Sequence, residues 1–291
     1  MKKLTYGLVI FTLILFVGLN YFYSPLMAIP TNKVDEEKDK PLNIMTVSKT
    51  QYELVKTLTK DKHNVDYLLE NEKEINSFII NEDIIKRIFD MDLLIYNGLG
   101  YEKWMNKLMN EVKNSNLGII NMSKGIIPLI KELGNKEENP YYLFGLNEYK
   151  IALYNIKISL QEKDIKNRLY YEENYNEKVE IMEKFYESSK NEISKYKDFI
   201  FIVDSDRLDY LFRDLNIKVE KISKENIDKF SLEYSNKEEK IIYVNDKNEE
   251  TLLDKIKLNI EDLEYIELST ELNEEELKNN IKLIIEAIKN N

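Results

Sequence analysis

The sequence predicts an α/β fold of two lobes, each built on a parallel sheet, with a long helix between them. Short apolar segments alternate with amphipathic ones over residues 42–122, and the alternation returns over residues 199–288. Helices between short strands are the crossovers that parallel strands require. Residues 147–196 contain no Gly or Pro. We therefore predict an N-terminal lobe, a helical connection and a C-terminal lobe at residues 41–140, 141–196 and 197–291.

The apolar spacing places the elements of the first lobe. Its predicted strands are Leu42–Val47, Val65–Leu69, Asp92–Tyr96 and Gly118–Met122. Its predicted helices are Gln51–Lys60, Glu82–Phe89 and Tyr101–Val112. The glycines of Asn97-Gly98-Leu99-Gly100 predict a turn with positive φ. This turn is too short for a phosphate-binding loop and lacks its Lys-Ser/Thr pair.

The connection is predicted to form one or two long amphipathic helices, because apolar side chains recur there at three- and four-residue intervals. The second lobe then has predicted strands at Phe199–Val203, Ile217–Ile222, Ile241–Val244 and Leu263–Leu268. Its predicted helices are Asp206–Asp214, Glu249–Ile256 and Asn273–Ile288. No internal repeat is visible in the residues themselves.

Residues 1–30 have the features of a signal anchor or signal peptide. Lys2 and Lys3 precede a mostly apolar run, Leu4–Tyr23, which at about 1.5 Å per residue can cross a bilayer. We expect a retained anchor, because bulky Leu26 stands where a cleavage site prefers a small residue. The lysines predict that the domain lies on the extracytoplasmic side of the cell membrane. It would be secreted if the signal is cleaved.

Composition limits the partners. The net charge of −11 argues against nucleic acid and against a polybasic membrane surface. The absence of Cys excludes disulfides and a lipid anchor attached through Cys. Polar residues 31–40 lack apolar periodicity and predict a flexible tether. We expect a monomer.

Four segments together carry a family resemblance. They are Asn81–Asp90, Asp92–Trp104 (DLLIYNGLGYEKW), Asn139–Tyr141 and Ser205–Asp214. Through them the chain resembles the substrate-binding proteins of zinc- and manganese-type ABC importers, over roughly residues 43–288. The resemblance implies a metal bound in the cleft between the lobes and an importer permease as partner.

In that family His residues hold the metal, joined by a carboxylate or a further His. The resemblance places the ligand positions at Asn76, Tyr141 and Ser205, with Glu267 as the carboxylate near the end of the last strand. Asp204 and Asp206 are predicted auxiliary groups. The three expected His positions therefore hold Asn, Tyr and Ser, and the short segment 133–139 has no His either.

The residue types set the chemistry of this site. Zinc prefers imidazole, thiolate and carboxylate ligands, and this chain has one His and no Cys. Mn²⁺ or Ca²⁺ accepts carboxylate and carbonyl oxygens, but two carboxylates make a weak cage. We expect a metal-importer binding protein with an atypical or lost metal site, and Zn or Mn as candidate ions. Two alternatives remain open: a binding-incompetent relative acting as a cell-surface interaction or regulatory protein, and a binder of another small ligand.

Other residues predict no chemistry. His63 falls in the polar turn Lys60–Asn64 and is expected to be exposed. One His cannot build a His-based zinc motif, and nothing in the sequence points to a Ser-His-Asp triad. Trp104 and the tyrosines of residues 141–154 are expected to pack. No residue pattern in the sequence indicates a hydrolase on this scaffold. With so many carboxylates, any choice of a catalytic acid and base would be arbitrary. We predict no enzyme.

Overall fold

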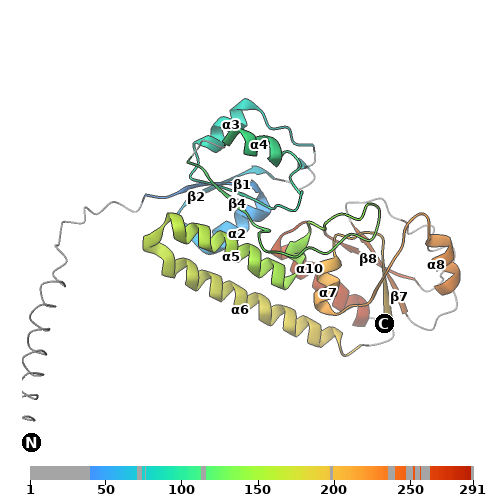
Figure 1. Cartoon of the computed structure of the whole chain (residues 1–291). Helices are drawn as coiled ribbons and strands as arrows, with labels where there is room; N and C mark the ends of the chain where they lie inside the picture. Colours follow the sequence, from blue (N-terminus) through green and yellow to red (C-terminus); the bar gives the residue numbers. More distant parts are fainter. Residues whose placement is uncertain are drawn as a thin grey trace, which may run out of the picture. The chain divides into compact units, whose positions relative to one another are not determined.

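Two four-stranded parallel sheets organise the chain (Figure 1). This computed structural model describes residues 40–70, 74–75, 77–112, 116–196, 199–234, 240–246, 252, 256 and 263–289. The predicted anchor, and the tether except Lys40, lie outside these ranges. In the described part, no helix is both long and apolar enough to span a membrane. Residues 42–291 form one unit by their contacts.

The first sheet has the order β2-β1-β3-β4. Its strands are β1 (Asn43–Ser48), β2 (Asn64–Leu69), β3 (Leu93–Tyr96) and β4 (Gly118–Asn121). Its helices are α2 (Lys49–Thr59), α3 (Glu82–Phe89) and α4 (Met105–Glu111). Successive side chains of β1 point to opposite faces of the sheet and so pack in two different cores. Ile44 packs with α2 on one face, and Met45 packs with α3 and α4 on the other. Figure 1 shows α3 and α4 on one face of the sheet and α2 and α5 on the other.

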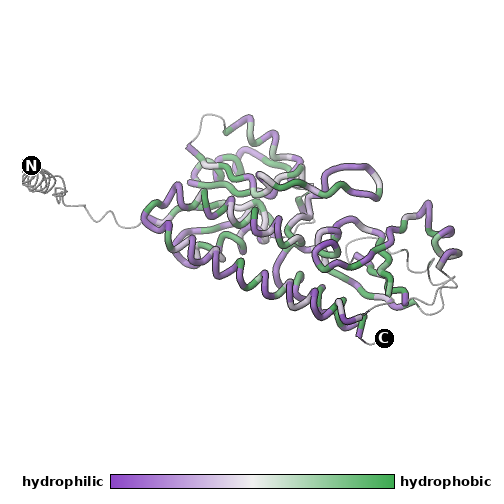
Figure 2. The backbone as a smooth tube through the Cα atoms, turned by 60° about the horizontal axis from the view of Figure 1, so that its bottom comes forward, coloured by the Kyte–Doolittle hydropathy of each residue, from purple (hydrophilic) through white to green (hydrophobic). Residues whose placement is uncertain are grey.

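Two antiparallel helices form the predicted connection. They are α5 (Leu146–Lys163) and α6 (Arg168–Ile193), joined by the short 3-10 helix η5 (Ile165–Asn167). The 26 residues of α6 rise roughly 39 Å. Helix α6 contacts α2 of the first lobe and both α7 and α10 of the second. Figure 2 shows hydrophilic and hydrophobic residues alternating along it, as an amphipathic helix requires.

The second sheet repeats the arrangement in the order β6-β5-β7-β8. Its strands are β5 (Phe199–Val203), β6 (Val219–Lys221), β7 (Lys240–Asp246) and β8 (Glu264–Leu268). Its helices are α7 (Asp209–Leu215), α8 (Ile227–Tyr234) and α10 (Glu274–Lys289). A further 3-10 helix, η4 (Tyr142–Phe144), precedes α5. Two parallel α/β lobes joined by a long helix are thus confirmed, while the limits predicted for the domains stay a prediction.

Some elements differ from their predicted bounds. The helix expected from Tyr101 begins at Met105, because the residues before it continue the preceding turn. The helix expected from Asp206 begins at Asp209. Helix α8 was not predicted. Most of the helix predicted over residues 249–256 lies outside the described residues.

The prediction that His63 is exposed is wrong. Its side chain is buried, and its Nδ1 accepts a hydrogen bond from the Leu42 amide at 3.2 Å. Its Nε2 lies 2.6 Å from the hydroxyl of Tyr171, which in turn donates to Asp164. The local sequence is polar, but α6 covers the turn. Tertiary packing therefore decides the burial.

The turn after β3 does adopt the predicted conformation. Gly98, Leu99 and Gly100 have φ values of 86°, 50° and 69°. A Cβ built on Gly98 would lie 2.1 Å from Asn121 Oδ1 and 2.3 Å from Ser123 Oγ, whereas one on Gly100 would have no neighbour within 4 Å. Gly98 is thus needed for both its φ and its close approach to the end of β4.

We expect Gly98→Ala to lower the free energy of unfolding by about 2 to 4 kcal/mol, since it combines steric overlap with a left-handed backbone. Gly100→Ala is the matched control and should cost about 1 kcal/mol, because only the backbone conformation is unfavourable there. Urea unfolding followed by circular dichroism measures both. Equal losses for the two variants would contradict the close approach at Gly98.

Candidate interlobe binding site

The segment that leaves the first lobe is bound directly to the second. The Tyr210 hydroxyl on α7 accepts a hydrogen bond from the Leu129 amide at 2.9 Å and donates to the Asn139 carbonyl at 3.0 Å. Asn139 is fully buried, and its Nδ2 donates to the Asp206 carbonyl at 2.6 Å. These contacts hold the predicted ligand position Tyr141 close to the predicted pair Ser205-Asp206.

Asp206 has a structural role in this link. Its carboxylate is buried and accepts hydrogen bonds from the amides of Glu132 at 3.1 Å and Leu133 at 2.9 Å. Lys221 also donates to it and pairs with Asp209 at 2.7 Å. Burial raises the pKa of Asp209 to about 6, although Lys221 acts in the opposite direction. Three donors therefore already bind the Asp206 carboxylate.

A second set of contacts fixes the start of α5 against α7. The Arg213 guanidinium binds both carboxylate oxygens of Glu148, at 2.9 and 2.6 Å. Asp214 accepts a hydrogen bond from the Leu146 amide at 2.6 Å. Bidentate arginine–carboxylate pairs are geometrically specific. The backbone around Tyr141 is therefore held from both sides.

Arg207 lies at the carboxyl ends of the second sheet's strands, close to the predicted ligand positions Tyr141 and Ser205. Arg207 Nη1 donates to Asp246 at 3.1 Å and to the Thr270 hydroxyl at 3.4 Å. The Arg207 Cζ atom lies 5.2 Å from the ring centroid of Tyr141, within cation–π range. We call Tyr141, Ser205, Arg207, Asp246 and Thr270 the Arg207 cluster.

Asp246 is the buried anion of this cluster. Only 1% of its side chain is exposed. It accepts hydrogen bonds from Thr270 Oγ1 at 2.8 Å and, more weakly, from Ser205 Oγ at 3.5 Å. A buried carboxylate without a partner is strongly unfavourable, and Arg207 supplies the compensating charge.

The cluster also reaches the first lobe. The Tyr141 ring meets the Tyr101 ring edge-on, with centroids 5.6 Å apart. Tyr101 directly follows the glycine turn, and Glu102 closes that turn by accepting hydrogen bonds from the amides of Asn97 at 2.7 Å and Gly98 at 3.1 Å. Gln51 of α2 also donates to Glu102, at 3.3 Å. Glu102 thus positions the first-lobe side of the site.

The structure brings some of the predicted site residues together. Tyr141 and Ser205 meet through Arg207 and Asp246. Asn76 lies outside the described residues. Glu267 is exposed on β8, where it accepts a hydrogen bond from Tyr265.

Asp204 faces a different neighbourhood. It accepts a hydrogen bond from Tyr243, which belongs to the core on the other face of the sheet from Val203 and Val244. Burial raises the pKa of Asp204, against the effect of that hydrogen bond. The ligand roles given to all six predicted site residues stay predictions: Asn76, Tyr141, Ser205, Glu267, Asp204 and Asp206.

Sequence reasoning missed Arg207, Asp246 and Thr270. Asp246 ends β7, while Arg207 and Thr270 follow β5 and β8 within a few residues. Parallel strands end at one edge of a sheet, where ligands of open α/β sheets bind. A search for polar residues at these strand ends could have found all three.

The donor set does not fit zinc. Across the described part of the chain, no three His, Cys, Asp or Glu side chains are grouped so as to hold a metal ion. The Arg207 cluster offers oxygen donors alone, and its carboxylate is already paired. Zinc sites use imidazole or thiolate.

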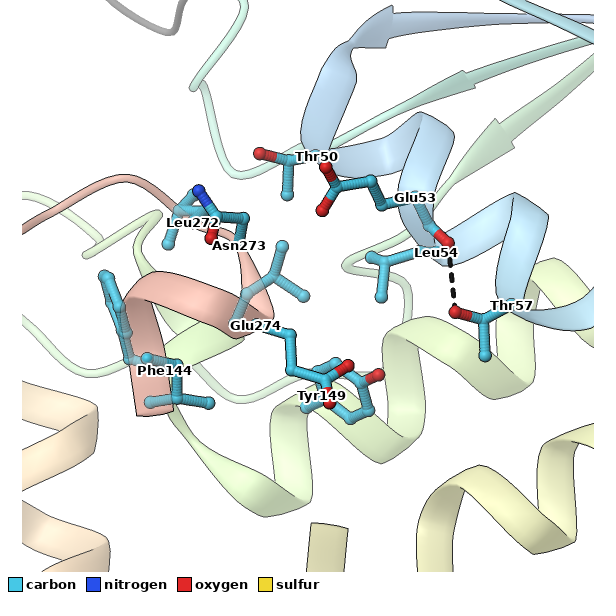
Figure 3. Close-up of a pocket in the computed structure, with 11 residues that line it drawn as sticks. Thr50, Glu53, Leu54, Thr57, Phe144, Tyr149, Leu272, Asn273 and Glu274 are labelled. Carbon is cyan, nitrogen blue, oxygen red and sulfur yellow. Dashed lines mark hydrogen bonds between the residues drawn. The ribbon is translucent and has the colours of Figure 1, made fainter. Parts of the chain in front are cut away.

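A small cavity lies between α2, α5 and the start of α10 (Figure 3). Its volume is about 40 Å³, which is enough to hold water. The buried Tyr149 hydroxyl lines it and has no hydrogen-bond partner among the described residues. At its rim, burial opposes ionisation of Glu274, but hydrogen bonds from Lys178 and Lys278 outweigh it and hold the pKa of Glu274 below its usual value.

A wider depression of about 260 Å³ adjoins this cavity and lies between α2 and the start of α10. Its lining is largely acidic and includes one ion pair, Lys49 with Glu70 at 2.5 Å. The lining residues are Lys49, Thr50, Glu53, Glu70, Glu271, Asn273, Glu275 and Glu276. These carboxylates do not converge into a metal-holding group either.

The described residues thus form two lobes on parallel four-stranded sheets, joined by the long helices α5 and α6. The sequence model of the family "Zinc-uptake complex component A periplasmic" matches residues 44–286. The chain belongs to this family.

Individual curated proteins are also similar to this chain in sequence. The chain is 25% identical over 176 residues to a metal ABC transporter substrate-binding lipoprotein of Lactococcus lactis subsp. lactis, covering 58% of this chain and 56% of that one. It is 26% identical over 202 residues to the high-affinity zinc uptake system protein ZnuA of Bacillus subtilis, covering 63% and 61%. The chain thus spans less than two thirds of the length of these relatives.

Solved structures share the fold. A periplasmic metal binding protein from Candidatus Liberibacter asiaticus has a TM-score of 0.71 at 20% identity, covering 86% of this chain and all of that one. The binding protein FpvC of Pseudomonas aeruginosa, solved with Ni²⁺, has a TM-score of 0.70 at 18% identity, covering 86% and 98%.

The buried carboxyl group of Glu102, which closes the glycine turn, should make the stability of the protein depend on pH. Burial raises the pKa of Glu102 from its ordinary 4.5 to about 7, although the two turn amides act in the opposite direction. Because the folded state binds this proton more tightly than the unfolded state, stability falls as pH rises from about 4.5 to about 7 and is level above. We expect this group to remove about 2 to 3 kcal/mol of unfolding free energy between about pH 5 and pH 8.

Urea unfolding of the wild type and of Glu102→Gln at both pH values measures this effect. The variant should lose much of the slope, because glutamine does not titrate. Exposed Glu111 on the neighbouring helix α4 provides the control Glu111→Gln, which should keep the wild-type slope. An unchanged slope in Glu102→Gln would refute the assignment.

Proposed function

We propose that this chain is an extracytoplasmic substrate-binding protein of a metal-type ABC importer, with an atypical site between its lobes. The observation that carries the proposal is the family match over residues 44–286, on a fold whose helix α6 contacts both lobes. The role is one of binding and delivery, with the importer permease as partner and a monomer as the working form.

The N-terminal segment fits that role. Residues 1–30 would serve as a retained membrane anchor, which replaces the lipid anchor implied by the names of several relatives. A chain without Cys cannot be acylated in the way that a lipoprotein is. The polar tether would then hold the two-lobed domain outside the membrane.

The substrate is proposed from the donor atoms. Relatives are named for manganese or for zinc. The hydroxyls of Tyr141, Ser205 and Thr270, together with the Asp246 carboxylate, are oxygen donors, which suit Mn²⁺ better than Zn²⁺. We therefore propose Mn²⁺ as the favoured cation, bound weakly because one carboxylate supplies little charge.

Helix α6 would limit how far the lobes move. It spans the contact region of both lobes, and the links from Asp206, Tyr210 and Arg213 fasten the chain on either side of Tyr141. Substrate binding would then rearrange side chains at the strand ends more than it rotates the lobes.

A metal titration tests the proposal. We expect Mn²⁺ to raise the melting temperature of the anchor-free chain, and Zn²⁺ to raise it less. A ligand at about 100 times its dissociation constant stabilises by about 2.7 kcal/mol. Calorimetric titration with each ion gives the affinities, and Mg²⁺ is the control for non-specific charge effects. No response to either transition metal would overturn metal delivery.

A further inference from the structure

We infer that Arg207 is an internal competitor for the cation substrate: its guanidinium occupies the place between the lobes that a bound cation would take. This inference rests on the proposed function and adds the residue that sets affinity there. It would make the site respond only to a cation that displaces the arginine.

The first argument is position. The guanidinium lies against the Tyr141 ring, at 5.2 Å, and within hydrogen-bond distance of Asp246, to which Ser205 also donates. Tyr141 and Ser205 are two positions at which the family resemblance predicts metal ligands. The arginine thus contacts the ring at one of those positions and shares the Asp246 carboxylate with the other.

The second argument is charge. A divalent cation at this place would need Asp246, the buried carboxylate of the cluster, and Arg207 already binds it at 3.1 Å. An incoming cation would have to break a charge-assisted hydrogen bond and also tolerate a nearby positive charge. Both effects lower its affinity.

The third argument is freedom of movement. The backbone before Arg207 is fixed, because Asp206 binds two amides of the first-lobe segment. The Arg207 side chain itself is 26% exposed, whereas that of Asp246 is 1% exposed. A long side chain with an open side can turn toward solvent while its carboxylate partner stays in place. The Arg207 side chain can therefore leave Asp246 when an external cation takes its place.

Arg207→Met tests the inference in the full chain, purified in detergent, with Mn²⁺ as the probe. Methionine keeps much of the side-chain length and removes the charge. We expect the dissociation constant for Mn²⁺ to fall at least about tenfold, which corresponds to about 1.4 kcal/mol. Calorimetry and electron paramagnetic resonance of free Mn²⁺ both measure it.

Matched variants isolate the cause. Arg87→Met removes the same charge from an arginine that is 55% exposed and paired with Asp66, and it should leave Mn²⁺ affinity within about twofold of the wild type. Adding Asp246→Asn to Arg207→Met should abolish the gain. If Arg207→Met does not fold with Asp246 uncompensated, Arg207→Gln keeps an amide donor for that carboxylate and should show the same gain.

The outcomes separate the two proposals. A wild type that ignores Mn²⁺, with a tight-binding Arg207 variant, supports the competitor and overturns Mn²⁺ delivery by the native site. A wild type that binds Mn²⁺, with unchanged affinity in both Arg207 variants, overturns the competitor and leaves the proposed function standing. Failure of every variant to bind Mn²⁺ overturns both.

Discussion

The geometry between the lobes depends on the Asp206 carboxylate, which binds backbone amides from the other lobe. A carboxylate that accepts hydrogen bonds from Glu132 and Leu133 and is neutralised by Lys221 satisfies polar groups that would otherwise be buried at a cost. The neighbouring Tyr210 completes the link through two further backbone groups. Because these contacts join residues more than 60 positions apart, they bring the end of the first lobe to the strand ends of the second.

In this site an arginine, in place of a metal ion held by histidines, balances the charge of a buried carboxylate. Asp246 is buried, and its charge is balanced by a guanidinium that also stacks on an aromatic ring. Buried pairs of this kind add little net stability, but removing one partner is expensive. The pair therefore acts mainly as a constraint, since it fixes which charge occupies the interlobe position.

Both sheets use the same strand order although no repeat is visible in the residues. A parallel sheet asks only for apolar strands at suitable intervals and helices long enough to cross over. Many different sequences meet that demand, so the topology recurs while the residues diverge. The shared strand order has one functional consequence. In each lobe the carboxyl ends of the parallel strands lie at one edge of the sheet, where side chains can be polar because they do not have to pack in the core.

The sequence by itself determined the two-lobed α/β architecture, the helical connection, the positive-φ turn at Gly98 and the resemblance to metal-importer binding proteins. These follow from local spacing and from residue types that a short segment reveals. The tertiary structure alone decided the burial of His63, the structural use of Asp206 and the meeting of Arg207 with Asp246 and Tyr141. Those depend on long-range packing, because a polar residue shows no local sign of the partner it will meet. An arginine near a strand end looks like an exposed charge until the fold brings a buried carboxylate beside it.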